Sequence, residues 1–153
     1  MIHSYPAGYV LDASVVVKWF ARQPERDRAV AVACRSAYIS GRFRIAVPVL
    51  CLIEVANALR YSPRAREADV AEAIDALNIL AFEVAPTDSE LLKKANAIAW
   101  GYGVTVYDAL YVALAEARGY PLITADDALR KRMHGHSIVL ALRDMDFQQM
   151  PGG

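Results

Sequence analysis

Four acidic residues lie within or beside strongly apolar segments of the sequence: Asp12, Glu54, Asp108 and Asp126. Carboxylates of a folded protein usually face water, because burying several like charges near one another is unfavourable unless a cation neutralises them. A divalent metal ion is the simplest such cation, and metals held by carboxylates commonly serve phosphate chemistry. The sequence therefore predicts a metal site, provided that the fold brings the four acids together.

Short apolar runs alternate with longer segments of helical periodicity along the chain. The expected strands are residues 8–12, 44–47, 81–85, 120–124 and 137–142. The expected helices are residues 13–20, 25–40, 48–61, 64–80, 87–101, 105–118 and 126–134. This alternation predicts an α/β fold with a mostly parallel central sheet covered by helices on both faces. We find no internal repeat or linker and predict a single domain over residues 1–153.

The predicted elements place the four acids at one edge of the sheet. Ligands of open α/β sheets gather outside the carboxyl ends of the strands. Asp12 ends the first strand and Asp126 follows the strand 120–124. Glu54 and Asp108 lie early in helices whose preceding segments we expect to leave the sheet at the same edge. Residues that are far apart in sequence could therefore form one site.

Each acid taken alone also has a purely structural explanation. The spacing Thr-Val-Tyr-Asp that ends at Asp108 is that of a capping box. Asp126 or Asp127 could be a helix-start acid favoured by the macrodipole, and Asp12 could cap the helix after it. Glu54 has no basic residue one helical turn further on. These explanations account for the acids singly, but not for their placement at the same edge.

Composition narrows the classes of protein that fit. Seventeen basic and seventeen acidic residues give a net charge of zero, so any nucleic-acid contact must use a local basic patch. No segment reaches the roughly 20 apolar residues that span a bilayer, and no signal peptide is evident at the N-terminus. Cys34 and Cys51 lack metal-ligand spacing and are expected as packed thiols in a reducing compartment. We therefore predict a cytoplasmic protein without a membrane partner.

Four segments of the chain share a pattern with one family. They read VLDASVVVKWF around Asp12, PVLCLIEVANAL around Glu54, YDALYVALAE around Asp108 and LITAD ending at Asp126. Together they resemble the PIN-domain ribonucleases, most closely the VapC-type toxins of type II toxin–antitoxin systems. Any one of these motifs would be weak evidence, whereas four in this order are specific.

The resemblance implies an α/β/α sandwich and a Mg²⁺- or Mn²⁺-dependent endoribonuclease that hydrolyses RNA phosphodiester bonds. As its mechanism we hypothesise in-line attack of a metal-activated water on the phosphodiester. The partners it implies are the RNA substrate, a second copy of the chain in a homodimer, and a cognate antitoxin. The C-terminal segment of that antitoxin would occupy a groove of the toxin. The RNA target does not follow from the resemblance, because family members differ in it.

The resemblance also assigns individual residues. The catalytic and metal-binding acids it implies are Asp12, Glu54, Asp108 and Asp126. The supporting polar residues it implies are Ser14, Asn57 and Thr124. Asp12 and Asp108 are the expected direct ligands, while Asp127 leaves the choice of ligand beside Asp126 open. The number of metal ions, one or two, is open as well.

Other functions share some of these features. A related metal-dependent DNA nuclease would use the same acids, and a phosphoacceptor signalling domain also places aspartates at strand ends. A catalytically silent binding module could keep the fold without the chemistry. Basic residues that could contact an RNA backbone are Lys18, Arg42, Arg44, Arg60, Arg64, Arg66 and residues 130–132.

Overall fold

A computed structural model describes residues 5–149 and contains one five-stranded parallel sheet. The strands are β1 (Gly8–Leu11), β2 (Arg44–Pro48), β3 (Glu83–Ala85), β4 (Leu122–Thr124) and β5 (Val139–Ala141). Their order across the sheet is β3-β2-β1-β4-β5, and every neighbouring pair is parallel. The α/β sheet architecture predicted from the sequence is confirmed, and the described sheet is wholly parallel.

Strand β1 lies at the centre of the sheet. All of its residues are buried, as expected for a strand covered on both faces. Val10 is in register with Ala46 of β2 on one side and with Leu122 of β4 on the other. The residue after β1 therefore leaves the sheet between two neighbouring strands, and that residue is Asp12.

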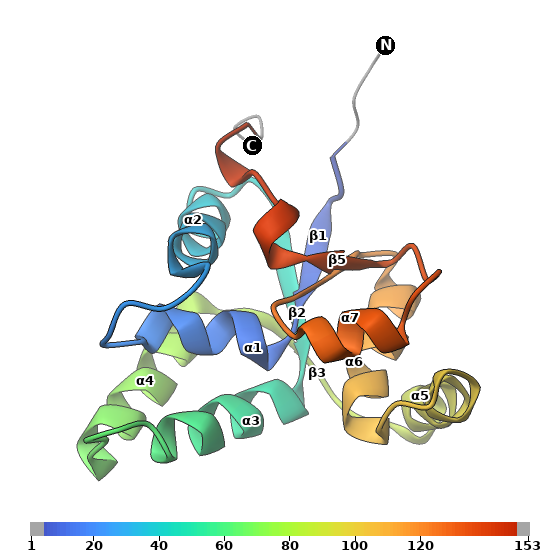
Figure 1. Cartoon of the computed structure of the whole chain (residues 1–153), viewed down its shortest axis with the longest axis horizontal. Helices are drawn as coiled ribbons and strands as arrows, with labels where there is room; N and C mark the ends of the chain where they lie inside the picture. Colours follow the sequence, from blue (N-terminus) through green and yellow to red (C-terminus); the bar gives the residue numbers. More distant parts are fainter. Residues whose placement is uncertain (1–4, 150–153) are drawn as a thin grey trace.

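Helices cover both sides of the sheet. They are α1 (Ala13–Val16), α2 (Arg28–Ile39), α3 (Val49–Arg60), α4 (Glu67–Leu80), α5 (Ser89–Tyr102), α6 (Val106–Arg118) and α7 (Asp127–Arg132). Short 3₁₀ turns follow at Val17–Phe20, Leu142–Asp144 and Phe147–Gln149. In Figure 1, α2 lies on one side of the sheet and α5 and α6 lie on the other, which gives the expected α/β/α layering. Strands β1 and β2 run toward the lower centre of that view, where α1 and α3 begin.

Two helices begin three residues later than the sequence pattern predicted. Helix α2 begins at Arg28 because Asp27 adopts a left-handed conformation, with φ at 60°. Arg64 is left-handed as well, with φ at 61°, and α4 begins only at Glu67. A residue in this conformation cannot continue a right-handed helix. Both residues are non-glycine, so their residue types did not predict these breaks.

Helix termini were otherwise close to expectation, with one misplaced cap. Thr105 caps α6 through its side chain and Gly119, with φ at 67°, closes it. At α5 the capping residue is Asp88, whose carboxylate accepts a hydrogen bond from Leu91 N at 2.8 Å. The segment Thr87-Asp-Ser-Glu90 has the spacing of a capping box, which predicts Thr87 as the cap, so that prediction is wrong by one residue.

Helix α6 forms the middle of the core. Every residue from Ala109 to Ala115 is buried, so the helix is enclosed on all sides rather than amphipathic. Within residues 5–149 no single helix is long and apolar enough to cross a membrane. Helices α5 and α6 meet that criterion only as a pair, bent by 115° between them.

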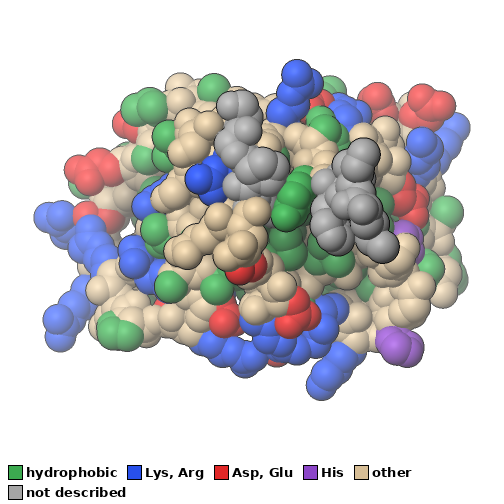
Figure 2. All heavy atoms as spheres, turned by 90° about the horizontal axis from the view of Figure 1, so that it is seen from above, with side chains coloured by type: hydrophobic (Ala, Val, Ile, Leu, Met, Phe, Trp, Pro, Cys, Tyr) green, Lys and Arg blue, Asp and Glu red, His purple; other side chains and the backbone are tan. Residues whose placement is uncertain are grey.

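The surface carries charges of both signs. Seen from above the view of Figure 1, Lys and Arg side chains gather along one rim with acidic side chains among them (Figure 2). The last turn of α7 contributes basic residues at 130–132, and Asp127 in its first turn pairs with Arg143. The balance of the whole sequence, with a net charge of zero, thus holds locally as well.

Candidate functional site

Asp12 lies at the carboxyl end of the central strand and is 7% exposed. Its Oδ2 accepts hydrogen bonds from Ser14 Oγ at 2.6 Å and from Thr124 Oγ1 at 2.9 Å. The Ser14 hydroxyl in turn accepts from Ala125 N at 3.0 Å. These bonds fix one oxygen of Asp12 and link the ends of β1 and β4, so the position of the carboxylate is set by the sheet itself.

The surroundings of the Asp12 carboxyl disfavour its ionised form. Burial raises the pKa of its carboxyl to about 6, against the lowering effect of the two hydroxyl donors. The rise to about 6 includes smaller contributions from the neighbouring carboxylates of Glu54 and Asp108. Asp12 is thus a buried acid, and the charges that act on it are those of other carboxylates.

Glu54 lies on α3 and is held by a residue that the sequence analysis did not single out. Tyr111 of α6, which is fully buried, donates its hydroxyl to Glu54 Oε1 at 2.6 Å. A tyrosine within an apolar helix is typical of core packing, so only the fold reveals its polar partner.

Asp108 lies in the first turn of α6 and is partly buried. Its backbone N donates to Thr105 Oγ1 at 3.1 Å, so the Thr105 half of the predicted capping box is present. Burial and the charge of Asp126 raise the pKa of the Asp108 carboxyl, while Thr105 and Arg132 act in the opposite direction. The helix of Asp108 follows α5 rather than a strand, unlike the predicted connection, yet Asp108 is close enough to influence Asp12.

Asp126 is the N-cap of α7. Its Oδ1 accepts from Ala128 N at 2.9 Å and Leu129 N at 3.1 Å. Its own backbone N donates to Thr124 Oγ1 at 3.0 Å. The structural explanation offered for this acid is therefore correct, and one carboxylate oxygen remains outside these bonds.

The adjacent Asp127 points into a different set of contacts. Its Oδ1 accepts from Arg143 Nη1 at 2.7 Å, and its Oδ2 lies 3.8 Å from Arg26 Nη1. Asp127 is thus already neutralised by arginines. Between the two neighbouring aspartates, this favours Asp126 as the acid available to a ligand.

The predicted supporting residues differ in their surroundings. Ser14 and Thr124 both donate to Asp12, and their oxygens lie 3.4 Å apart. Asn57 is exposed on α3, and its side chain makes no hydrogen bond within residues 5–149. The structure therefore joins the two hydroxyls to the acids and leaves Asn57 apart from them.

The acids approach one another without forming a finished metal cage. The charges of Glu54 and Asp108 act on Asp12, and that of Asp126 acts on Asp108. Nowhere in residues 5–149 do three or more His, Cys, Asp or Glu side chains form a ready cation-binding cluster. Among the ion pairs of the same residues, none involves these four acids.

This donor set suits a hard divalent cation. Such cations prefer carboxylate oxygens, and Mg²⁺ commonly takes one or two carboxylates and retains several waters. Asp12 is buried beside like charges, and within residues 5–149 no basic side chain pairs with it. A metal ion would supply the missing positive charge, and the partial convergence of the acids is compatible with an ion that keeps waters in its shell.

Lys18, one of the basic candidates for RNA contact, is buried. Its Nζ donates to Glu25 Oε1 and to the carbonyl oxygen of Arg26, both at 2.8 Å. The ammonium thus fastens the loop between the first 3₁₀ turn and α2, and it is not free to meet a phosphate.

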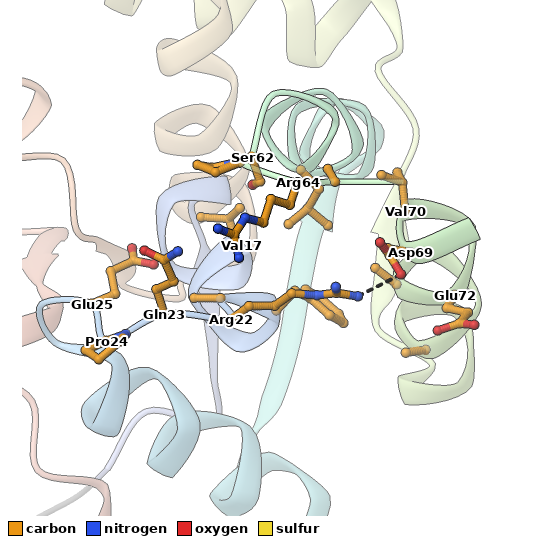
Figure 3. Close-up of a pocket in the computed structure, with 17 residues that line it drawn as sticks. Val17, Arg22, Gln23, Pro24, Glu25, Ser62, Arg64, Asp69, Val70 and Glu72 are labelled. Carbon is orange, nitrogen blue, oxygen red and sulfur yellow. Dashed lines mark ion pairs between the residues drawn. The ribbon is translucent and has the colours of Figure 1, made fainter. Parts of the chain in front are cut away.

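A cavity of about 740 Å³ opens on another part of the molecule, away from the four acids. Its walls come from the first 3₁₀ turn and the loop after it, the end of α3, and α4. Val17 and Val70 contribute apolar wall, and Arg22 reaches across to Asp69 at 2.7 Å (Figure 3). None of the four acids lines it, so it is a separate concavity suited to a ligand with both apolar and charged groups.

Comparison with known proteins agrees with this architecture. The solved structures similar to this chain include the PAE2754 protein of Pyrobaculum aerophilum, with 24% identity, a TM-score of 0.65, and coverage of 90% of this chain and 85% of the other. They also include a toxin–antitoxin complex from Klebsiella pneumoniae, with 16% identity, a TM-score of 0.67, and coverage of 88% and 98%. At these identities the likeness concerns the fold.

Sequence similarity identifies the family. Ribonuclease VapC3 of Pyrobaculum aerophilum is 54% identical over 44 residues, which are 29% of this chain and 34% of that relative. The match thus spans about a third of the length of the relative. The PIN domain family model matches residues 9–134, the greater part of the sequence. This chain belongs to the PIN domain family.

Proposed function

We propose that this protein is a metal-dependent endoribonuclease that acts as the toxin of a toxin–antitoxin pair. The observation that carries the proposal is the setting of Asp12: a buried carboxylate, fixed by two hydroxyls, beside two like charges and paired with no cation among residues 5–149. Membership of the PIN family and the local match to a ribonuclease named VapC3 support it.

The residues would divide the work as follows. Asp12 and Asp108 would hold Mg²⁺ or Mn²⁺, with Glu54 completing the site and Asp126 acting beside them. A bound ion of this kind can lower the pKa of a water and stabilise charge on a phosphoryl oxygen. Ser14 and Thr124 keep Asp12 in one rotamer, so the carboxylate needs no reorganisation when substrate binds.

Cleavage of RNA by purified variants tests the proposal. Asp12→Asn and Asp108→Asn remove a charge with little change of volume, and we expect both to lose cleavage of single-stranded RNA in the presence of Mn²⁺. Rates equal to those of the unmodified chain in both variants would refute the assignment. Flapped DNA in a parallel assay separates the proposal from a DNA nuclease, and calorimetry with Mn²⁺ separates it from a silent binding module.

We propose that the cavity beside α4 receives a segment of the antitoxin. The complex named for the Klebsiella pneumoniae structure supports a partner of this class, and the cavity offers apolar walls with Arg22 and Asp69 at its side. Val70→Arg would place a charge in the wall. We expect it to weaken the complex with the cognate antitoxin, while RNA cleavage by the free chain stays unchanged.

We also propose a homodimer in the cytoplasm. The isolated chain leaves large apolar side chains in water, among them Trp100 of α5 at 85% exposure and Ile53 of α3 at 61%. Apolar area of this kind is typical of protein–protein contacts. Sedimentation should give the mass of two chains, and Trp100→Ser and Ile53→Asp should each shift it toward one.

A further inference from the structure

We infer that Tyr111 is a positioning residue of the acid site, which acts by holding Glu54 Oε1 and leaving Oε2 as the oxygen free for a ligand. This inference rests on the proposed function and adds a residue to it. The contact joins two helices through residues 57 positions apart in the sequence, with an O···O distance of 2.6 Å.

The strength of this contact follows from its chemistry. A hydroxyl that donates to an ionised carboxylate makes a charge-assisted hydrogen bond, which is shorter and about twice as strong as a neutral one. The phenol is fully enclosed, so its O–H needs a partner inside the protein. Glu54 is only partly buried, whereas Tyr111, whose hydroxyl donates to it, is enclosed in the core. The tyrosine therefore restricts the glutamate, rather than the reverse.

Helix α6 gives the contact a fixed geometry. Asp108 and Tyr111 are three residues apart and so lie on the same side of the helix. The helix is buried from Ala109 to Ala115 and cannot shift without disturbing the core. One rigid element thus supplies both an acid of the site and the support for a second acid on α3.

A purely structural role for the hydroxyl makes a different prediction. If the hydroxyl only satisfied the core, its removal would lower stability and leave ion binding alone. If it positions Glu54, its removal should weaken ion binding, because groups that orient metal ligands typically contribute about 10- to 100-fold in affinity or activity. The two readings are separated by measuring Mn²⁺ affinity and thermal stability on the same variants.

Tyr38 provides a matched control. Its hydroxyl also donates at 2.6 Å, but to the backbone carbonyl of Leu80, at a contact that includes none of the acids. Tyr111→Phe and Tyr38→Phe therefore each delete one short hydrogen bond and leave the ring in place. Any loss common to both reports the general cost of such a bond.

We expect Tyr111→Phe to bind Mn²⁺ at least about 10-fold more weakly by calorimetry, and Tyr38→Phe to bind it as the unmodified chain does. In RNA cleavage, kcat should fall in Tyr111→Phe while KM for RNA stays constant. In a Glu54→Gln background, Tyr111→Phe should have little further effect on Mn²⁺ affinity, since its action passes through Glu54.

Several outcomes would overturn the inference. Equal Mn²⁺ affinities of Tyr111→Phe and Tyr38→Phe would assign the hydroxyl to the core. If Tyr111→Phe fails to fold, 4-fluorophenylalanine at position 111 fills the same space without donating, and failure of that variant to fold would also assign the hydroxyl to the core. Absence of Mn²⁺ binding and RNA cleavage in the unmodified chain would instead overturn the proposed function, so the two failures are distinguishable.

Discussion

Asp12 and Asp69 are both aspartates with little exposure, 7% for the residue and 11% for the side chain respectively, yet the protein surrounds them differently. Asp69, at the cavity beside α4, lies 2.7 Å from Arg22 Nη2 and 2.8 Å from Arg66 Nη2. Asp12, after the central strand β1, accepts hydrogen bonds from two hydroxyls, the only donors to its carboxylate among residues 5–149, and lies near Glu54 and Asp108.

The consequence of this difference is opposite shifts in acidity. Hydrogen bonds from Arg66, with help from Arg22, lower the pKa of the Asp69 carboxyl well below its usual range. Burial raises the pKa of the Asp12 carboxyl to about 6. The chain thus supplies its own cations to a carboxylate that ties a loop to a helix. Under the proposed function, the carboxylates at the C-terminal ends of the strands would instead take a cation from solution.

The largest expected contrast between these two regions is in RNA cleavage. Asp12→Asn should lower the rate by more than about 100-fold, the upper range for groups that merely support a metal ligand. Asp69→Asn should leave the rate unchanged, because its charge is used within the protein. Both rates are measured with Mn²⁺ on the same single-stranded RNA. A comparable loss in the two variants would mean that the contrast between the regions has no functional meaning.

The second contrast concerns stabilisation by a metal ion. An ion present at 100 times its dissociation constant stabilises the folded state by about 2.7 kcal/mol, which corresponds to roughly 5–10 °C for a protein of this size. We expect Mn²⁺ to raise the unfolding temperature of the unmodified chain and of Asp69→Asn by this amount, and excess chelator to reverse it. An equal rise in Asp12→Asn would place the ion elsewhere.

Much of this architecture could be predicted from the sequence. Apolar runs ending in acids gave the strands β1 and β4, and Thr105 and Gly119 marked the ends of α6. Because the carboxyl ends of parallel strands share one edge, the grouping of Asp12 and Asp126 followed from topology, whereas that of Asp108, whose helix follows α5, did not. These features depend on local pattern and on the direction of strands, both of which the sequence carries.

Other features depend on contacts that no local pattern encodes. Tyr111 lies in an apolar helix, and its partner Glu54 is 57 residues away. Lys18 reads as a surface charge until the loop after it folds back and supplies Glu25. The late start of α2 follows from the left-handed Asp27, a conformation that residue type did not indicate. Side-chain partners across the fold thus required the structure.

The third contrast is in the pH dependence of stability without metal. Asp12 has a folded-state pKa of about 6 against an ordinary value of 3.8, so the cost of its ionisation to folding builds up between pH 4 and pH 6 and is complete above that range. At about 1.4 kcal/mol per pKa unit, this cost is at most about 3 kcal/mol at neutral pH, and it is relieved as the pH falls from 6 toward 4. Urea unfolding should give Asp12→Asn a larger free energy of unfolding than the unmodified chain at pH 7. The difference should be smaller at pH 5.

Asp69 should show the opposite sign in the same experiment. Its pKa is lowered in the folded state, so its contribution is present above the unfolded value near pH 4 and is lost as the pH falls further. Asp69→Asn should therefore be less stable than the unmodified chain by the same amount at pH 7 and pH 5, and the difference should narrow below pH 4. A difference that changes between pH 7 and pH 5 would contradict this assignment.

The smallest expected effect concerns Asp126, which could serve both as a structural acid and as a ligand of an ion. Asp126 is one of the four acids of the candidate site, yet it caps α7 as a structural acid would. Asp126→Ala removes the cap and should cost about 1 kcal/mol of stability, whereas Asp126→Asn keeps a capping oxygen and should cost little. If the charge of Asp126 also serves an ion, Mn²⁺ affinity will fall in Asp126→Asn although stability does not. Unchanged affinity in Asp126→Asn would place Asp126 with Asp69 among the purely structural acids.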